Sequence, residues 1–210
     1  MPQQWVVIVP VKELTFAKTR LGQLTPKDRG DFALATARDV VAAARGCPLV
    51  AAVFVVTNDA LAATTLVEDG ARVIADVSDN GLNPALENGA RVATGWHPRS
   101  GVAAVSSDLA GLTSAELAAA LGAAVAARCF VTDEEGTGTT MLTAAAGVPL
   151  APAFGADSRQ RHLRSGAVEL SGEWPGLRCD VDTAEDLARA RARPLGAHTS
   201  RLLERLRLPA

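Results

Sequence analysis

The sequence has few cysteines, no long basic run and no apolar segment of membrane-spanning length. Its three cysteines, Cys47, Cys129 and Cys179, are scattered, and no C-x-x-C pair occurs, so neither a disulfide framework nor a thiolate zinc site is predicted. Each is expected to be a small buried residue. A net charge of −2 without a run of basic residues argues against nucleic-acid binding. The expectation is a soluble cytoplasmic protein with no nucleic-acid or membrane partner.

Strand and helix signals alternate along the chain. The first apolar run, Trp5–Val9, is rich in β-branched residues and is typical of a strand buried on both faces. Further strands are expected over 50–57, 71–74, 101–105 and 129–132, and helices over 26–45, 60–68 and 114–127. This alternation predicts a single α/β domain over residues 1–210, with a mostly parallel, doubly wound sheet flanked by helices and a helical tail at 199–210.

Three cations follow the first strand. Lys12, Lys18 and Arg20 come just after Pro10, where the carboxyl end of that strand is expected. A cationic loop at this edge of a parallel sheet can bind a polyphosphate, although a solvated surface loop can carry the same residues. No G-x-G-x-x-G follows the strand, which argues against a dinucleotide-dependent oxidoreductase.

Aspartates are placed where metal ligands are expected. Asp108 comes just after the apolar run 101–105. Asp180 and Asp182 are two residues apart on a predicted strand, so their side chains would share a face. Adjacent carboxylates repel each other unless a cation lies between them, and Mg²⁺ is the obvious candidate. Asp108 could instead be an ordinary cap or turn residue, and Thr183 is expected to cap the helix that follows Asp182.

Two segments carry small and hydroxyl-bearing residues suited to an anion. The glycines of 136–139 would let the backbone approach a ligand, and the hydroxyls of Thr137 and Thr139 can donate to phosphate or carboxylate. A plain turn is equally consistent with that segment. Asp157 or Ser158 is expected to cap a short helix with an anion-binding N-terminus, whereas His162 on that helix is more often structural than catalytic.

A polar loop precedes another well-capped helix. Asn83 is predicted to be its N-cap, with Pro84 in the first turn. A side-chain amide in such a loop could also recognise a nucleotide base. Capping alone would explain the residue, so both readings stay open.

These segments resemble a known family. Residues 9–12, 17–21, 107–109 and 180–183 are similar to nucleotidyltransferases of the GT-A type, which have a Rossmann-like fold. The closer resemblance is to the guanylyltransferases of coenzyme F-420 biosynthesis, carried over almost the whole chain by residues 136–139, 154–158, 162, 165–170 and 174–183. The glycine-rich loop of many nucleotidyltransferases is replaced by the three cations, as in this smaller family. Ala110 stands where relatives often have proline.

The resemblance implies a reaction between two anions. A phosphate oxygen of the acceptor, phosphoenolpyruvate or 2-phospho-L-lactate, would attack the α-phosphorus of GTP and release pyrophosphate. No general base is needed, because a phosphate nucleophile is already ionised at neutral pH. The product would be enolpyruvoyl- or lactyl-2-diphospho-5′-guanosine, which a downstream deazaflavin transferase could consume.

The resemblance also implies roles for individual residues. The β- and γ-phosphates of GTP would be held by Lys12, Lys18 and Arg20. Magnesium would be held by Asp108 and Asp180, with Asp182 close by. The acceptor-binding positions are matched by Thr139, Gly155 and Ser158. Guanine recognition is placed on residues 81–89, which include Asn83.

Two alternatives compete with this interpretation. One is another GT-A nucleotidyltransferase, such as one that loads guanylate onto molybdopterin. The other is a non-catalytic, nucleotide-binding regulatory domain, which the joint presence of Lys12, Asp108 and the 180–182 aspartates disfavours. The alanine- and arginine-rich composition resembles actinobacterial members and favours phosphoenolpyruvate by analogy. The native acceptor, the guanine-specificity residues, the oligomeric state and the role of the tail stay open.

Overall fold

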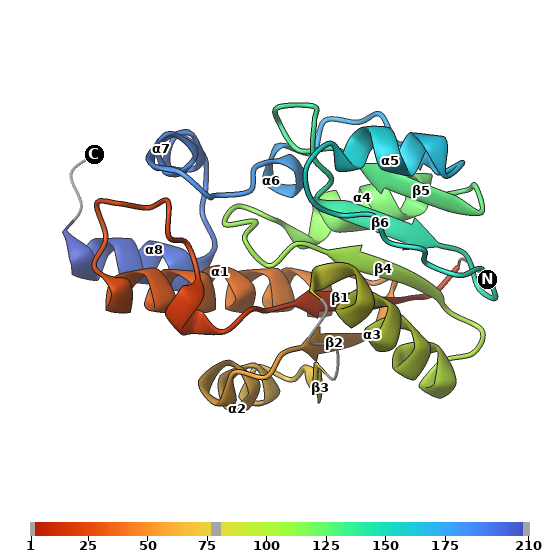
Figure 1. Cartoon of the computed structure of the whole chain (residues 1–210), viewed down its shortest axis with the longest axis horizontal. Coiled ribbons are helices and arrows are strands. Elements are labelled where there is room, and N and C mark those ends of the chain that lie inside the picture. Colours follow the sequence, from red (N-terminus) through yellow and green to blue (C-terminus); the bar gives the residue numbers. More distant parts are fainter. Residues whose placement is uncertain (1–2, 77–80, 208–210) are drawn as a thin grey trace.

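A seven-stranded sheet is the framework of the molecule (Figure 1). The computed structural model describes residues 3–76 and 81–207, and the strand order within them is β3-β2-β1-β4-β6-β5-β7. The strands are β1 (Trp5–Pro10), β2 (Val50–Val56), β3 (Arg72–Ile74), β4 (Gly101–Val105), β5 (Arg128–Val131), β6 (Met141–Ala144) and β7 (Val168–Glu169). Only β6 among these runs antiparallel to its neighbours, β4 and β5, so the predicted mostly parallel sheet is confirmed.

Strand β1 is buried on both faces, as its apolar run predicts. Val7 and Val9 face one hydrophobic core, and Val6 and Ile8 face the other. Such a strand can exist only inside a sheet that is covered on both sides. Because β1 pairs in parallel with β2 and β4, the loops that follow these three strands leave the same edge of the sheet.

Helices cover the two faces. They are α1 (Pro26–Arg45), α2 (Ala60–Glu68), α3 (Leu82–Trp96), α4 (Ser114–Ala123), α5 (Ser158–Arg164), α6 (Pro175–Arg178), α7 (Ala184–Arg191) and α8 (Ala197–Leu206), with a 3₁₀ turn at Leu14–Phe16. Most buried apolar residues of α1 belong to one core together with those of α2 and α4, and those of α3 belong to the other. None of the described helices combines the length and apolar character needed to cross a membrane. The three cysteines are free and buried, as expected.

Helix starts follow the capping signals at most positions. The side chain of Thr25 accepts from the backbone N–H of Asp28, and Thr113 forms a capping box with Glu116. The prediction of Asn83 as an N-cap is wrong, because α3 begins at Leu82 and Gly81 occupies the N-cap position. Gly81 has φ +94°, which only glycine adopts freely, so the chain turns into the helix earlier than predicted. Helix α4 also ends before the predicted residue 127, because the chain must turn into β5.

The C-terminal helix α8 lies alongside α1 (Figure 1). Leu202 and Leu203 join a third core with Phe32 of α1. The buried carboxylate of Asp39 on α1 accepts from the first-turn amides of α8 at His198 and Thr199, both at 2.9 Å. The expected tail is therefore part of the packed structure. Its end, 208–210, and residues 77–80 of the expected polar loop lie outside the described residues.

Candidate active site

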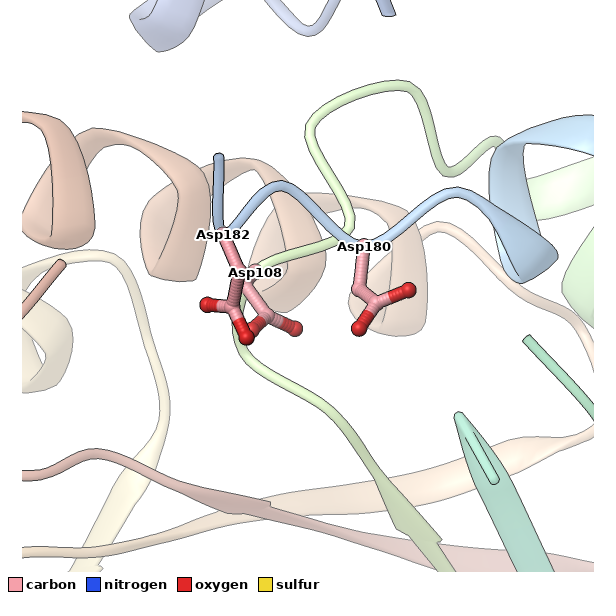
Figure 2. A group of neighbouring side chains, drawn as sticks. All are labelled: Asp108, Asp180 and Asp182. Carbon is pink, nitrogen blue, oxygen red and sulfur yellow. The ribbon is translucent and has the colours of Figure 1, made fainter. Parts of the chain in front are cut away.

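Three aspartates meet beyond the carboxyl ends of the central strands (Figure 2). Asp108 lies in the loop after β4, and Asp180 and Asp182 come from the segment that joins α6 to α7. One carboxylate oxygen from each lies within 4.8 Å of the others. We call Asp108, Asp180 and Asp182 the acid triad. The sequence predicted these three residues as one site, and the structure brings them together.

The segment that carries Asp180 and Asp182 is not a strand, so that part of the prediction is wrong. The backbone N–H of the buried Val181 donates to the carbonyl of Asp108, 3.2 Å away. Asp108 comes after the end of β4, so this bond is not part of the sheet. With Val181 packed into the core, the residues on either side present their carboxylates to Asp108, as Figure 2 shows. The predicted cap is confirmed, because Thr183 forms a capping box with Asp186 at the start of α7.

Lys18 supplies the cation inside the acid triad. Its Nζ lies 2.7 Å from Asp108 Oδ2 and 2.7 Å from Asp182 Oδ1. The Lys18 side chain is only 8% exposed. Burial opposes its charge, but the two carboxylates outweigh burial and raise its pKa. The sequence predicted Lys18 on the phosphates of a nucleotide and did not predict this pairing.

The acid triad retains features of a site for a divalent cation. Burial, followed by repulsion from Asp108, Asp182 and Asp133, raises the pKa of Asp180. Asp108 Oδ1 is buried and has no hydrogen-bond partner among the described residues. A hard divalent cation prefers carboxylate oxygens and would offset their mutual repulsion. The donor set therefore fits such an ion, with Lys18 compensating part of the charge.

Two adjoining cavities open around the acid triad. The lysine cavity, about 350 Å³, is lined by Lys12, Lys18, Arg20 and Asp108. The threonine cavity, about 620 Å³, is lined by Thr139, Gly155, Ser158 and Asp180. Both are lined by Lys12, Arg20, Leu82, Ser106 and Asp182. The carboxylates therefore lie where two ligands, one in each cavity, would meet.

The predicted phosphate-binding cations are divided by the fold. Lys12 and Arg20 are exposed side chains that line both cavities, whereas Lys18 is turned into the acid triad. The loop that carries them is not entirely irregular, because it contains the 3₁₀ turn at Leu14–Phe16. Lys18 has φ +52°, an unusual value for a residue with a side chain.

Thr139, Gly155 and Ser158 come together in the threonine cavity. The hydroxyl oxygens of Thr139 and Ser158 are 3.1 Å apart. Gly155 has φ +112°, so it makes a turn that a side chain would oppose. These predicted acceptor residues come from the loop before β6 and the start of α5, 16 to 19 positions apart in the sequence.

Backbone amides near these hydroxyls are already bound within the protein. Asp133 accepts from the amides of Thr137, at 2.9 Å, and Gly138, at 2.7 Å. At the start of α5, the Ser158 amide donates to Gly155 and the Arg159 amide donates to Thr137. Two amides at this helix start, those of Ser158 and Arg159, are therefore occupied, and anion binding there stays a prediction. Sequence reasoning missed Asp133, although it follows β5 as Asp108 follows β4.

The predicted side-chain cap of α5 is also wrong. Asp157 occupies the N-cap position, but its φ of +53° differs from the extended backbone of a capping residue, and its side chain makes no capping bond within the described part of the chain. The hydroxyl of Ser158 is instead hydrogen-bonded to the hydroxyl of Thr139. The anionic Asp157 side chain still lines the threonine cavity.

Asn83 links α3 to the segment before α5. Its Nδ2 donates to the carbonyl of Phe154, at 3.1 Å, and its Oδ1 accepts from the Phe154 amide, at 2.8 Å. Both polar ends of the side chain therefore bind the protein's own backbone. Its predicted contact with a nucleotide base stays a prediction.

Comparisons with known proteins bear on this site. A family described as "Guanylyl transferase CofC like" matches residues 5–209. A phosphoenolpyruvate guanylyltransferase of Geodermatophilus obscurus is 54% identical, covering 95% of this chain and 94% of that protein. A protein of the same name from Streptomyces coelicolor is 50% identical, covering 97% of each.

Solved structures share the fold. A putative nucleotide-diphospho-sugar transferase from Desulfovibrio desulfuricans has a TM-score of 0.69 at 15% identity, covering 97% of this chain and 95% of that one. A 4-diphosphocytidyl-2C-methyl-D-erythritol synthase has a TM-score of 0.62 at 15% identity, covering 91% and 98%. The sheet and its helices therefore have the same fold as these two proteins.

Proposed function

The chain belongs to the CofC-like guanylyl transferase family, and we propose that it transfers GMP from GTP to phosphoenolpyruvate, releasing pyrophosphate. The product would be enolpyruvoyl-2-diphospho-5′-guanosine, an intermediate for coenzyme F-420 biosynthesis. The name shared by relatives that align over nearly their full length supports this acceptor. 2-Phospho-L-lactate is the acceptor against which the proposal is tested. GTP and phosphoenolpyruvate are cytoplasmic metabolites, so we propose the cytoplasm as the compartment.

The observation that carries the proposal is the acid triad at the junction of two cavities. The reaction must bring two anionic phosphates together, and uncompensated repulsion would prevent their approach. We propose that Asp108, Asp180 and Asp182 hold Mg²⁺, with Asp108 Oδ1 among the ligands because it has no hydrogen-bond partner within residues 3–76 and 81–207. When bound, Mg²⁺ would supply positive charge to the α-phosphate and the attacking oxygen.

The cations have different roles in this proposal. Lys12 and Arg20 are exposed on the walls of both cavities, so they can hold the β- and γ-phosphates and stabilise the departing pyrophosphate. Lys18 holds Asp108 and Asp182 in place and keeps a positive charge on the wall of the lysine cavity. GTP therefore belongs in the lysine cavity.

The acceptor belongs in the threonine cavity. Thr139 and Ser158 offer hydroxyl groups to a small phosphorylated carboxylate, and Gly155 leaves its approach open. The acceptor phosphate is already ionised, so its attack needs no protein base. Asn83 fixes Phe154 on the wall of this acceptor cavity. Its neighbour Leu82 lines both cavities, so the start of α3 would reach the nucleotide through Leu82 rather than through Asn83 itself.

Pyrophosphate release with GTP and Mg²⁺ tests the proposal. Phosphoenolpyruvate should support release, 2-phospho-L-lactate should support it poorly, and omission of Mg²⁺ should abolish it. A downstream deazaflavin transferase should be included to trap the product. Pyrophosphate release with 2-phospho-L-lactate but not with phosphoenolpyruvate would identify 2-phospho-L-lactate as the acceptor. Release with neither acceptor would contradict the proposed function and leave the fold assignment intact.

A further inference from the structure

His162 is buried beneath the acceptor hydroxyls. It is 0% exposed and packs against the rings of Phe130 and Phe154, with centroids 5.6 and 5.3 Å from its own. Both ring nitrogens have partners: the Ala153 amide lies 3.0 Å from Nε2, and Thr139 Oγ1 lies 2.9 Å from Nδ1. Burial, together with the positive charges of Arg128 and Arg161, lowers the pKa of His162 to about 4. The ring is therefore neutral near pH 7.

The Ala153 amide fixes the tautomer of His162. A backbone N–H can only donate, so Nε2 must offer its lone pair. A neutral imidazole then carries its single proton on Nδ1. It follows that His162 donates to Thr139 Oγ1, and Thr139 accepts.

The direction of the hydrogen bond between His162 and Thr139 decides how many hydroxyl hydrogens of Thr139 and Ser158 are left to donate to a ligand. Thr139 and Ser158 have two hydroxyl hydrogens between them, and the 3.1 Å bond joining their oxygens uses one. With the proton on His162 Nδ1, the second hydrogen is left for a ligand. In the opposite tautomer Thr139 would donate to Nδ1 and Ser158 to Thr139, so that neither hydrogen would remain.

We propose that His162 is a positioning residue of the acceptor site: by donating to Thr139 it leaves the Thr139–Ser158 pair with one hydroxyl hydrogen for an oxyanion in the threonine cavity. The inference rests on the proposed function for the identity of that oxyanion, a carboxylate or phosphate oxygen of the acceptor. The same hydrogen count disfavours a ligand whose only polar group at this point is a donor. His162 touches neither substrate and transfers no proton.

Two substitutions separate the two bonds of His162. An Asn side chain reaches the position of Nδ1, and a Gln side chain reaches that of Nε2. His162→Asn can therefore still donate to Thr139, whereas His162→Gln can still accept from Ala153 but cannot donate to Thr139. We expect His162→Gln to raise the KM for phosphoenolpyruvate roughly tenfold, the size of effect expected for one hydrogen bond to a charged group. His162→Asn should raise it less, and neither should change the KM for GTP.

A double-mutant cycle tests whether His162 acts through Thr139. Thr139→Val removes the hydroxyl, so adding His162→Gln to Thr139→Val should raise the acceptor KM no further. Thermal unfolding of each variant monitors the fold. Additive effects on the acceptor KM, or equal increases in both substrate KM values, would overturn the proposal and leave His162 as a packing residue.

The tautomer can be measured without any substrate. In protein labelled with ¹⁵N-histidine, the resonances lost in His162→Asn should report a protonated Nδ1 and a bare Nε2 at pH 7. A protonated Nε2 would overturn the inference whatever the activity. If the wild-type protein releases no pyrophosphate with either acceptor, the proposed function fails, and the tautomer measurement still decides the hydrogen-bond arrangement.

Discussion

At the residue scale, Lys18 is the group around which the acid triad is arranged. Parallel strands deliver their following loops to one edge, so the sequence could predict that Asp108 lies near Lys12 and Lys18. It could not predict that Lys18 turns inward, because its φ of +52° is set by the surrounding loop rather than by its own preference. The position predicted for a metal between carboxylates is shared with a cation of the chain itself.

Replacing Asp108 should separate catalysis from folding. Asp108→Asn removes one charge from the acid triad and weakens both the bond to Lys18 and the proposed metal site. We expect the kcat for pyrophosphate release to fall roughly a hundredfold or more, with an unchanged far-UV circular dichroism spectrum. Asp31→Asn, in a surface ion pair with Lys27 and Arg205, is the control and should keep its activity. Near wild-type turnover of Asp108→Asn with Mg²⁺ would contradict the metal role.

His162 should make the protein less stable in mild acid. Its pKa is lowered from 6.5 to about 4 by burial and by two arginines, so the unfolded chain binds a proton that the folded chain rejects. The resulting stability is complete above pH 6.5 and is lost as the pH falls toward 4, by up to about 3 kcal/mol. The difference in unfolding free energy between wild type and His162→Asn, measured in urea, should shrink over this range. A pH-independent difference would show that His162 does not titrate in this way.

At the element scale, helix starts were predictable where a side chain caps the backbone, as at Thr25, Thr113 and Thr183. The same local logic failed at Asn83, where Gly81 begins the helix and the amide serves a distant backbone segment. It also failed at residues 179–182, where the alternation of polar and apolar residues predicts a strand. This segment is instead irregular and is hydrogen-bonded, through Val181, to the loop after β4. Long-range packing decided both places, and one sequence does not reveal such packing.

The packing of α3 on the sheet offers a matched pair of glycines. A Cβ at Gly89 would lie 2.7 Å from Val56 Cγ2 and 3.1 Å from Ile8 Cγ2, whereas a Cβ at Gly95 would meet no atom of the described part of the chain within 4 Å. We expect Gly89→Ala to destabilise the protein by about 1–3 kcal/mol through overpacking. Gly95→Ala should be neutral or stabilise it by up to about 1 kcal/mol, because alanine favours the helix. Chemical denaturation measures both, and equal effects would show that α3 does not lie this close to β1 and β2.

At the scale of the whole molecule, the start of the C-terminal helix α8 is attached to the loop that carries Asp108. Gly196, at the start of α8, donates to the carbonyl of Ala110 in the loop that carries Asp108. A Cβ at Gly196 would lie 2.1 Å from Asp39 Cγ, so the close approach requires glycine. The sequence predicted this helix but not its attachment, because Asp39 is an unremarkable acid in the pattern of α1.

Asp39 should therefore contribute to global stability. Each of its carboxylate oxygens accepts from one amide of α8, and an Asn side chain would present an N–H₂ group to one of those amides. We expect Asp39→Asn to lower the free energy of unfolding by about 1–3 kcal/mol. Asp31→Asn on the same helix, at its exposed ion pair, should change it little. Equal urea midpoints for the two variants would contradict this attachment of α8.

The proposed reaction transfers the α-phosphate of GTP, as GMP, to phosphoenolpyruvate. The most direct measurement follows two radiolabels in parallel reactions with phosphoenolpyruvate and Mg²⁺. We expect an α-phosphate label to enter a product that contains both guanosine and the acceptor, and a γ-phosphate label to leave in pyrophosphate. Transfer of the γ-label to the acceptor, or release of GMP without an acceptor adduct, would contradict it.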